Sequence, residues 1–305
     1  MRCPDISELP PPPAGETGWP WTEQSARLPE AMPDGTPWPR ISIVTPSFNQ
    51  GRFIEETIRS ALLQGYPNLD YIVIDGGSTD QTISILEKYS RWLSYRVSEP
   101  DRGQSHAINK GMRKATGEIA AWLNSDDWLE PDTLSAVALA FRKLPDGLVG
   151  LTGACRWRRE GNVSEIRHPR SIFYPRLGKQ ILYGLQQPST FFRKAAFDRV
   201  GGVDQKIHFM MDKDLWLRFQ QQGWDFQPLE MVLSNFRCHE DSKTTGKKPR
   251  VNLTVARESF RLRNKFLGSP LRPAYWIQLA GSLAELAQSY RLALWEKLNR
   301  KGDTR

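Results

Sequence analysis

Two acidic motifs about fifty residues apart carry the side chains best suited to chemistry in this chain. The first is Asp75-Gly76-Gly77-Ser78-Thr79-Asp80, after the apolar run 71–74, and the second is Asn124-Ser125-Asp126-Asp127, after the apolar run 119–123. Carboxylates at the C-terminal ends of neighbouring strands project into the crevice where open α/β sheets bind ligands. One cluster could hold a nucleotide and the other a divalent cation, so the pair predicts transfer of an activated group from a nucleotide.

Strand and helix patterns alternate regularly from residue 41 onward, and they would position these motifs. Strands are predicted at 41–45, 71–74, 95–97, 118–123, 148–153, 190–192 and 229–236. Helices are predicted at 53–63, 79–89, 104–114, 132–144, 212–222, 251–266 and 273–298. Such alternation with short loops indicates right-handed βαβ units and a mainly parallel sheet.

The composition is that of a globular protein. The chain has 305 residues, of which 39% are hydrophobic and 25% are charged. Cys3, Cys155 and Cys238 lie far apart without a CxxC pair, so neither a disulfide framework nor a zinc knuckle is indicated. The sequence shows no signal-peptide pattern and no apolar run long enough to span a bilayer. We therefore expect a protein of the reducing cytoplasm.

The formal charge of +8 is concentrated at the C-terminus. Residues 243–305 contain fourteen Lys and Arg and four acids, a net of +10, which leaves about −2 for the rest of the chain. The apolar stripe of the predicted helix 273–298 makes this tail a basic amphipathic segment. Docking on anionic lipid and packing on its own domain or on a homodimer partner both stay open. Because the tail lacks the interleaved aromatic residues of single-strand grooves, we do not expect nucleic acid as a partner.

The motifs, taken in order, resemble those of family 2 glycosyltransferases. The resemblance covers about residues 41–240 and runs through the segments 42–49, 75–80, 99–111, 115–118, 123–127 and 211–218. Each motif alone would be weak, but their order makes the match specific. The resemblance implies an α/β fold called GT-A: a Rossmann-like, mixed and mainly parallel sheet flanked by helices, here with a C-terminal helical extension. It also implies an enzyme that moves a sugar from a nucleotide-diphosphate sugar, expected to be UDP-linked, with inversion at the anomeric carbon.

The resemblance also implies the donor-binding residues. In the family, the aspartate at the position of Asp75 accepts a hydrogen bond from the uracil imide, which an acceptor-only group can do. The alternative role for Asp75 and Asp80 is to form the turn and cap the next helix, which we expect for Asp80. Asn109 could equally be a structural hydrogen-bonder. The nucleotide-sugar-binding set is Thr45, Pro46, Ser47, Asn49, Asp75, Gly76, Asp101, Gln104, Asn109, Asn124, Ser125 and Asp126.

The second motif corresponds to the DxD element of the family, which implies Mg²⁺ or Mn²⁺ as cofactor. Such ions prefer oxygen ligands and take one or two protein carboxylates beside the phosphates of the substrate. Asn124 stands where the pattern usually has its first aspartate, so this position contributes no negative charge. Asp126 is the first candidate ligand and Asp127 the second. His239 is a third, with a purely structural role as the alternative.

Asp212 is the candidate general base, because inversion requires a group that removes the proton of the acceptor hydroxyl. Many relatives have Glu-Asp here, whereas this chain has Met211-Asp212 and lacks the neighbouring acid. Asp214 is the second candidate for this role, with a charge at the helix N-terminus as the alternative. The loop 241–250 offers ammonium groups for the diphosphate at Lys243, Lys247 and Lys248.

The chain is thus predicted to have three parts: a Pro- and Trp-rich arm (1–40), a GT-A domain (41–240, with a nucleotide-sugar half 41–130 and an acceptor half 131–240), and a basic loop and helical tail (241–305). The expected acceptor is a saccharide or a lipid-linked saccharide, in cell-surface polysaccharide or glycolipid synthesis at the inner face of the membrane. The alternative is a non-catalytic nucleotide- or saccharide-binding scaffold whose tail docks on a membrane or partner. The presence of Asp75, Asp126 and Asp212 in one chain argues against a non-catalytic scaffold. A nucleotidyltransferase would need a basic glycine-rich loop near the first strand, which the sequence lacks.

Overall fold

The computed structural model describes residues 1–159, 162–174, 179–243 and 249–267. The chain divides into two compact units, Met1–Lys248 and Pro249–Arg305. In the second unit the described element is helix α7 (Pro249–Leu267), which agrees with the helix predicted at 251–266. The predicted helix 273–298, Lys247 and Lys248 lie outside the described residues.

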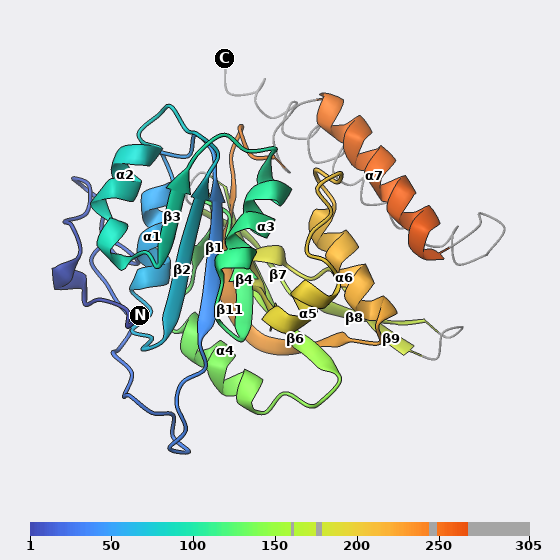
Figure 1. The fold of residues 1–305 in the computed structure, drawn as a ribbon, viewed down its shortest axis with the longest axis horizontal. Coiled ribbons are helices and arrows are strands. Elements are labelled where there is room, and N and C mark those ends of the chain that lie inside the picture. The colour runs from blue at the N-terminus through green and yellow to red at the C-terminus, as the bar shows by residue number, and fades with distance from the viewer. Residues whose placement is uncertain (160–161, 175–178, 244–248, 268–305) are drawn as a thin grey trace, which may run out of the picture. The chain divides into compact units, whose positions relative to one another are not determined.

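A nine-stranded sheet forms the centre of the first unit, in the order β3-β2-β1-β4-β10-β6-β11-β5 with β7 paired to β6 (Figure 1). Its strands are β1 (Ile41–Ser47), β2 (Leu69–Asp75), β3 (Tyr95–Ser98), β4 (Ile119–Trp122), β5 (Trp128–Leu129), β6 (Leu148–Arg159), β7 (Asn162–Arg167), β10 (Thr190–Arg193) and β11 (Asp225–Cys238). The four strands from β3 to β4 are parallel, and β10 runs antiparallel between β4 and β6. The prediction of a mixed, mainly parallel sheet is confirmed.

Helices cover both faces of this sheet (Figure 1). One buried cluster joins side chains of α1 (Ile54–Leu62), α2 (Thr82–Lys88) and α4 (Thr133–Arg142), and a second joins those of α3 (Gln104–Lys114), α5 (Lys194–Arg199) and α6 (Met211–Gln221). Strand β1 contributes to both clusters because successive side chains of a strand point to opposite faces. Helix α3 lies close to β1 because Gly111 has no side chain: a Cβ there would be 2.3 Å from Cγ1 of Val44.

Several elements were not predicted, namely β5, β7, α5 and the two-stranded sheet of β8 (Arg170–Tyr174) and β9 (Lys179–Tyr183). Strand β6 also continues to Arg159, well beyond the predicted end at residue 153. Residues 154–159 include three arginines among six residues. This part of β6 pairs with β7, a polar segment, and with β11, which is distant in the sequence. This pairing extends the strand, and the local sequence does not indicate the partners.

The arm formed by residues 1–40 packs on the rest of the first unit. Its backbone donates hydrogen bonds from Cys3 to the carbonyl of Tyr66 (2.8 Å) and from Leu28 to that of Gly65 (3.1 Å). Its density of prolines leaves it without a regular helix or strand apart from a 3₁₀ turn, Ile6–Glu8. Apolar side chains of the arm join the same cluster as α1, so the arm extends the hydrophobic core.

Candidate active site

The carboxyl ends of β1, β2 and β4 meet at one edge of the sheet. The order β3-β2-β1-β4 places β1 and β4 side by side although β2 and β3 intervene in sequence, which is the switch point where open α/β sheets bind ligands. Register sets Ser47 beside Asp75. The amide of Gly76 donates to the carbonyl of Ser47 (2.9 Å), and a Cβ on Gly76 would lie 3.0 Å from Oδ2 of Asp101. Ser47, Asp75, Gly76 and Asp101 therefore lie together, as predicted for a donor crevice.

Asp75 is fully buried and holds the turn that follows β2. Its Oδ2 accepts hydrogen bonds from the amides of Gly77 (3.1 Å) and Ser78 (2.8 Å) and from the hydroxyl of Ser98 (2.6 Å). Its Oδ1 accepts from the hydroxyl of Ser78 at 2.5 Å. The turn-forming role of Asp75 is thus present in the structure, and Oδ1, with one hydrogen bond, is the less engaged of its two oxygens. Asp80 accepts from the amides of Gly51 (2.8 Å) and Thr82 (3.0 Å), as expected of a capping residue.

Thr45 and Asn49 make contacts that join neighbouring segments at this edge of the sheet. The hydroxyl of Thr45 is buried and lies 3.1 Å from that of Tyr71, so this residue, like Pro46, has only its backbone to offer. Asn49 has a positive φ of 52°, a conformation that asparagine tolerates, and its Oδ1 accepts from the amide of Thr79 (2.9 Å). These contacts join the loop after β1 to the loop after β2.

Ser47 and Phe48, at the end of β1, have features that contacts within the protein do not explain. The hydroxyl of Ser47 is buried, and no group among the described residues hydrogen-bonds to it. Phe48 is 59% exposed, which is unusual for a large apolar side chain beside a buried strand. Sequence reasoning missed Phe48, although its place between Ser47 and Asn49 at a strand end could have identified it.

A chain of hydrogen-bonded amide side chains links several of the predicted donor residues. Nε2 of Gln104 donates to Oδ1 of Asn124 (2.7 Å), and Lys243 Nζ donates to Oε1 of Gln104 (2.9 Å). Nδ2 of Asn124 in turn donates to Oε1 of Gln187 (3.0 Å) and to Oδ2 of Asp127 (3.3 Å). An aspartate at position 124 could not make the last two bonds, because it has no donor at neutral pH. The structure adds Gln187 to this chain of bonds, a residue outside the predicted donor-binding set.

Two predicted donor residues, Asn109 and Ser125, are buried. Nδ2 of Asn109 donates to the carbonyl of Val203 (2.8 Å), and its Oδ1 accepts from the amide of the same residue (3.0 Å). Asn109 is therefore a structural hydrogen-bonder, which was the open alternative, and the prediction that it lines the donor site is not supported by its contacts. Ser125 is only 4% exposed and lies inside the loop that carries the acids.

Asp126 and His239 form a pair between segments that are 113 residues apart. Oδ2 of Asp126 lies 3.1 Å from Nε2 of His239, and both side chains are partly exposed. Nδ1 of His239 has no hydrogen-bond partner within the described residues, and the ring packs on Phe53 with 4.6 Å between centroids. A carboxylate oxygen and an imidazole nitrogen side by side are groups that a divalent cation can take as ligands.

Asp127, the other predicted metal ligand, is turned inward. It is fully buried, and its Oδ1 accepts from the amide of Arg237 (3.1 Å). Burial first, and then the charge of Asp126, raise the pKa of the Asp127 carboxyl well above its usual range. Each of its oxygens accepts a hydrogen bond within the protein, so Asp127 supports the loop from inside.

The side chains available as metal ligands suit a cation that is bound by few protein groups. Among the residues that the structure describes, no three His, Cys, Asp or Glu side chains converge on one point. Mg²⁺ and similar ions are commonly held by one or two protein groups while phosphates of the substrate and water complete the shell. Asp126 and His239 match that pattern.

Asp212 lies in the first turn of α6 and is partly buried. Its Oδ1 accepts from the amide of Lys213 (2.8 Å). Burial raises the pKa of its carboxyl, and the positive charges of Lys213 and Lys243 act in the opposite direction. Asp214, by contrast, is fully buried and forms an ion pair of 2.7 Å with Arg218.

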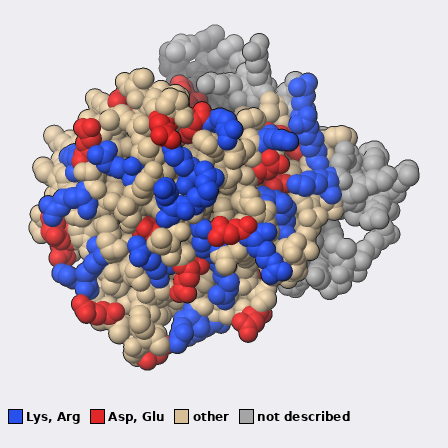
Figure 2. Space-filling view, in the orientation of Figure 1, with Lys and Arg blue, Asp and Glu red and all other residues tan. Residues whose placement is uncertain are grey.

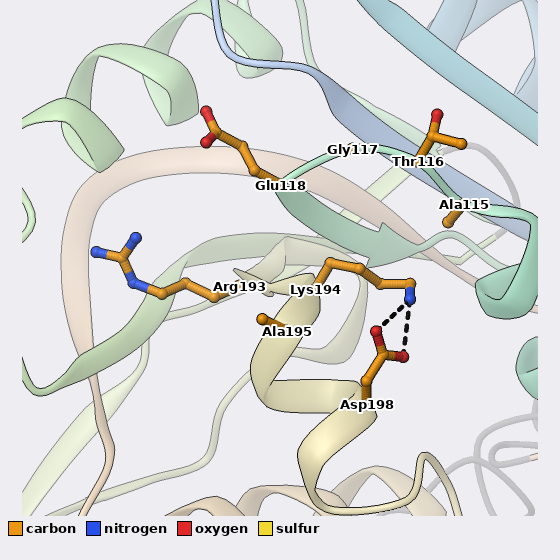
Figure 3. A pocket seen from close by; sticks show the side chains of 8 residues that line it. All are labelled: Ala115, Thr116, Gly117, Glu118, Arg193, Lys194, Ala195 and Asp198. Atoms are coloured by element: carbon orange, nitrogen blue, oxygen red, sulfur yellow. Dashed lines mark hydrogen bonds and ion pairs between the residues drawn. The ribbon is translucent and has the colours of Figure 1, made fainter.

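The motif 115–118 serves the architecture of the opposite edge of the sheet. The amide and hydroxyl of Thr116 donate to Oδ2 of Asp70 (2.8 and 3.0 Å). An open hollow of about 450 Å³ lies beside this motif (Figure 3). Its charged groups include Lys194 and Asp198, which pair with each other at 2.7 Å. The hollow lies at the start of β4, away from the crevice at the carboxyl ends.

The surface charge is mixed. Figure 2 shows Lys and Arg interspersed with Asp and Glu over the face that it displays, which agrees with the near-neutral balance of residues 1–242. Within the described ranges, no helix has both the length and the apolar character needed to cross a bilayer.

Known proteins resemble this chain in sequence. Residues 42–201 match the family model described as Glycosyl transferase family 2. TuaG of Bacillus subtilis (strain 168), a glycosyltransferase named for teichuronic acid biosynthesis, is 28% identical over 222 residues, which are 70% of this chain and 84% of TuaG. The chondroitin synthase of Escherichia coli is 28% identical over 215 residues, 68% of this chain but only 30% of that protein.

Solved structures share the fold at low identity. The crystal structure of S. aureus TarS 1-349 in complex with UDP-GlcNAc matches with a TM-score of 0.57 and 18% identity, covering 77% of this chain and 69% of that chain. The mannosyltransferase PcManGT from Pyrobaculum calidifontis, in complex with GDP-Man and Mn²⁺, matches with a TM-score of 0.54 and 20% identity, covering 87% and 83%. These matches confirm the predicted GT-A fold.

The family match spans more than half of the 305 residues and includes both acidic motifs. It confirms the prediction of a transferase over that of a non-catalytic scaffold. This chain belongs to family 2 of the glycosyltransferases.

Proposed function

We propose that the protein transfers a sugar from a UDP-linked donor to an acceptor hydroxyl with inversion, assisted by Mg²⁺ or Mn²⁺. The observation that carries the proposal is the pair of Asp126 and His239, 3.1 Å apart, beside the crevice where the donor residues meet. A nucleotide diphosphate needs a cation partner, and this pair offers one next to groups suited to a nucleoside.

The nucleoside would occupy the ends of β1 and β2. The exposed ring of Phe48 offers a stacking surface for a base, and base–aromatic stacking contributes about 1–3 kcal/mol. The partnerless hydroxyl of Ser47 and the remaining acceptor capacity of Asp75 Oδ1 would bind polar edges of the nucleoside. A uracil imide is an N–H donor, which suits an acceptor-only carboxylate. Gly76 and Asp101 would lie beside the ribose and diphosphate.

Asp126 and His239 would hold the cation, which when bound neutralises charge that develops on the leaving diphosphate. Asp127 supports them from inside the loop. Lys243 would add a positive charge on the same side, because its Nζ is held 2.9 Å from Gln104, a proposed donor residue.

Asp212 would remove the proton of the acceptor hydroxyl. A carboxyl whose pKa is raised by burial is a stronger base than an exposed aspartate, and the nearby charge of Lys243 limits that rise. Asp214 is engaged by Arg218 and does not compete for this role.

The acceptor is proposed to be a saccharide or a lipid-linked saccharide of a cell-surface polysaccharide or glycolipid. The names of TuaG and of chondroitin synthase, which refer to polysaccharides, favour this class. We propose residues 41–240 as the catalytic domain, and the basic tail as a docking segment for the inner face of the membrane or for a second copy.

The function is tested first by thermal shift with a panel of nucleotide sugars in the presence of Mn²⁺. A donor that binds the folded site raises the unfolding temperature. The donor that gives a shift is then used to measure metal-dependent hydrolysis in wild type, Asp212→Asn and the control Asp214→Asn.

We expect turnover to fall about 10²–10⁴-fold in Asp212→Asn, the usual contribution of a general base. Asp214→Asn removes an acid two residues away and is expected to lower stability while retaining turnover. Turnover by Asp212→Asn at the rate of wild type would refute the assignment of the base. No hydrolysis of any donor by wild type, together with no thermal shift, would refute the enzymatic function.

A further inference from the structure

The loop that carries Asp126 and Asp127 is bonded to a buried polar stripe on α1 that the proposed reaction does not use. Thr57 and Ser60 lie on α1, and Gln64 lies just beyond its end. They recur at steps of three and four residues, so they share one side of the helix. Their exposures are 1%, 0% and 1%, and burial of three polar side chains in a row requires partners.

The first two residues of the stripe bind the loop next to the acids. Oγ1 of Thr57 donates to the backbone carbonyl of Asp127 (2.7 Å). Oγ of Ser60 accepts from the amide of Leu129 (3.1 Å), two residues further on. These hydroxyls satisfy backbone groups that would otherwise be buried without a partner.

Gln64 extends the same pattern to the start of α4. Its Nε2 donates to the carbonyl of Glu130 (2.9 Å), and its Oε1 accepts from the amide of Leu134 (3.1 Å). Both ends of the amide are therefore used. Four backbone groups between residues 127 and 134 are bonded to this stripe.

Helix α1 also reaches the strand that supplies His239. Glu56 forms an ion pair with Arg237, whose Nε donates to the carbonyl of Asp126 (3.1 Å). The amide of Arg237 donates to Asp127 Oδ1 at 3.1 Å. One helix thus contacts both of the segments that bring Asp126 and His239 together.

We propose that Thr57 and Ser60 are positioning residues that hold Asp126 at its distance from His239 and so set the affinity for the cation. The inference rests on the proposed function, because it takes these two side chains as the cation ligands. Loss of a hydroxyl leaves a backbone group unpaired, and the loop relaxes to rehydrate it. Changes in the groups that support a metal ligand commonly weaken metal affinity by about 10–100-fold.

The test measures binding of Mn²⁺ in the presence of UDP, by electron paramagnetic resonance of free Mn²⁺, together with the unfolding temperature. Thr57→Val removes the hydroxyl at constant shape, and Thr57→Ser keeps it. Ser60→Ala is paired with Ser42→Ala as a control. Ser42 is equally buried; its Oγ donates to Asp70 (2.6 Å) and accepts from the amide of Gly117 (2.8 Å), at the opposite edge of the sheet.

We expect the Mn²⁺ dissociation constant to rise at least about tenfold in Thr57→Val and Ser60→Ala. Thr57→Ser and Ser42→Ala are expected to bind Mn²⁺ like wild type, even though Ser42→Ala lowers the unfolding temperature. Unchanged Mn²⁺ affinity in folded Thr57→Val would overturn the inference. An equal loss of Mn²⁺ affinity in Ser42→Ala would also overturn it, because it would indicate a general effect of destabilisation. If Ser60→Ala does not fold, the comparison of Thr57→Val with Thr57→Ser still tests the inference. Absence of Mn²⁺ binding in wild type would instead overturn the proposed cation site.

Discussion

Replacement of Arg59 by methionine should release the N-terminal arm. Arg59 lies on α1 and is fully buried. Its guanidinium donates to three carbonyls of the arm, those of Pro20 (3.0 Å), Pro10 (2.8 Å) and Trp21 (2.7 Å), and to the hydroxyl of Tyr89 (3.1 Å). Methionine fills the volume of the aliphatic stem but donates none of these bonds.

The size of the effect follows from two opposing contributions. Hydrogen bonds to a charged group stabilise by about 1.5 kcal/mol each at the low end, so four bonds are worth on the order of 6 kcal/mol. Burial of a guanidinium costs several kcal/mol of desolvation, and its removal offsets roughly half of the loss. A net destabilisation of about 3 kcal/mol should lower the unfolding temperature of a chain of this size by roughly 5–10 °C.

The assay combines calorimetry with limited proteolysis of residues 1–40. Arg91→Met is the matched control, because Arg91 is exposed and stacks on Trp92 at 4.6 Å from the ring centroid. We expect the control to unfold like wild type and its arm to stay protected. The predicted role of Arg59 is refuted if Arg59→Met unfolds at the same temperature as wild type. It is also refuted if the variant unfolds at a lower temperature while residues 1–40 resist protease as they do in wild type.

Three further predictions concern the site. Lys243→Met removes a positive charge that lowers the pKa of Asp212, so the rising limb of the pH–rate profile should move to higher pH; a shift to lower pH, or none, contradicts the assigned base. Phe48→Ala should weaken binding of UDP by about 1–3 kcal/mol in isothermal titration, without a change in unfolding temperature, since the ring is 59% exposed. Asn109→Leu should cost roughly 2 kcal/mol of stability by denaturant titration, because two hydrogen bonds to Val203 are lost, and the UDP affinity of the folded variant should be unchanged.

Much of the fold could be predicted from local patterns. Helix α3 was predicted at its observed bounds, and β1, β2 and β4 were each predicted within about two residues of theirs, because burial on both faces of a parallel sheet leaves a continuous apolar run. The strand ends also indicated where the acids would meet, since parallel strands present their carboxyl ends at one edge.

The roles of single polar residues were harder to predict. Asp75 and Asn109 are both polar residues of recognised motifs, yet Asp75 makes four hydrogen bonds within its own turn and beside it, and Asn109 ties α3 to Val203. A sequence motif states which group is present. It does not state which neighbour, far away in the chain, uses its donors and acceptors.

Motif order and periodic patterns were enough to predict the order of the elements, the family, and where the acids and Asp212 fall relative to those elements. The contact of Asp126 with His239, the inward turn of Asp127, and the bonds of Gln187 and Lys243 to Asn124 and Gln104 depend on how the whole domain folds. The physical reason is that secondary structure follows from short-range periodicity of burial. A binding site depends on register, loop paths and hydrogen bonds between segments more than a hundred residues apart, which packing of the whole domain sets.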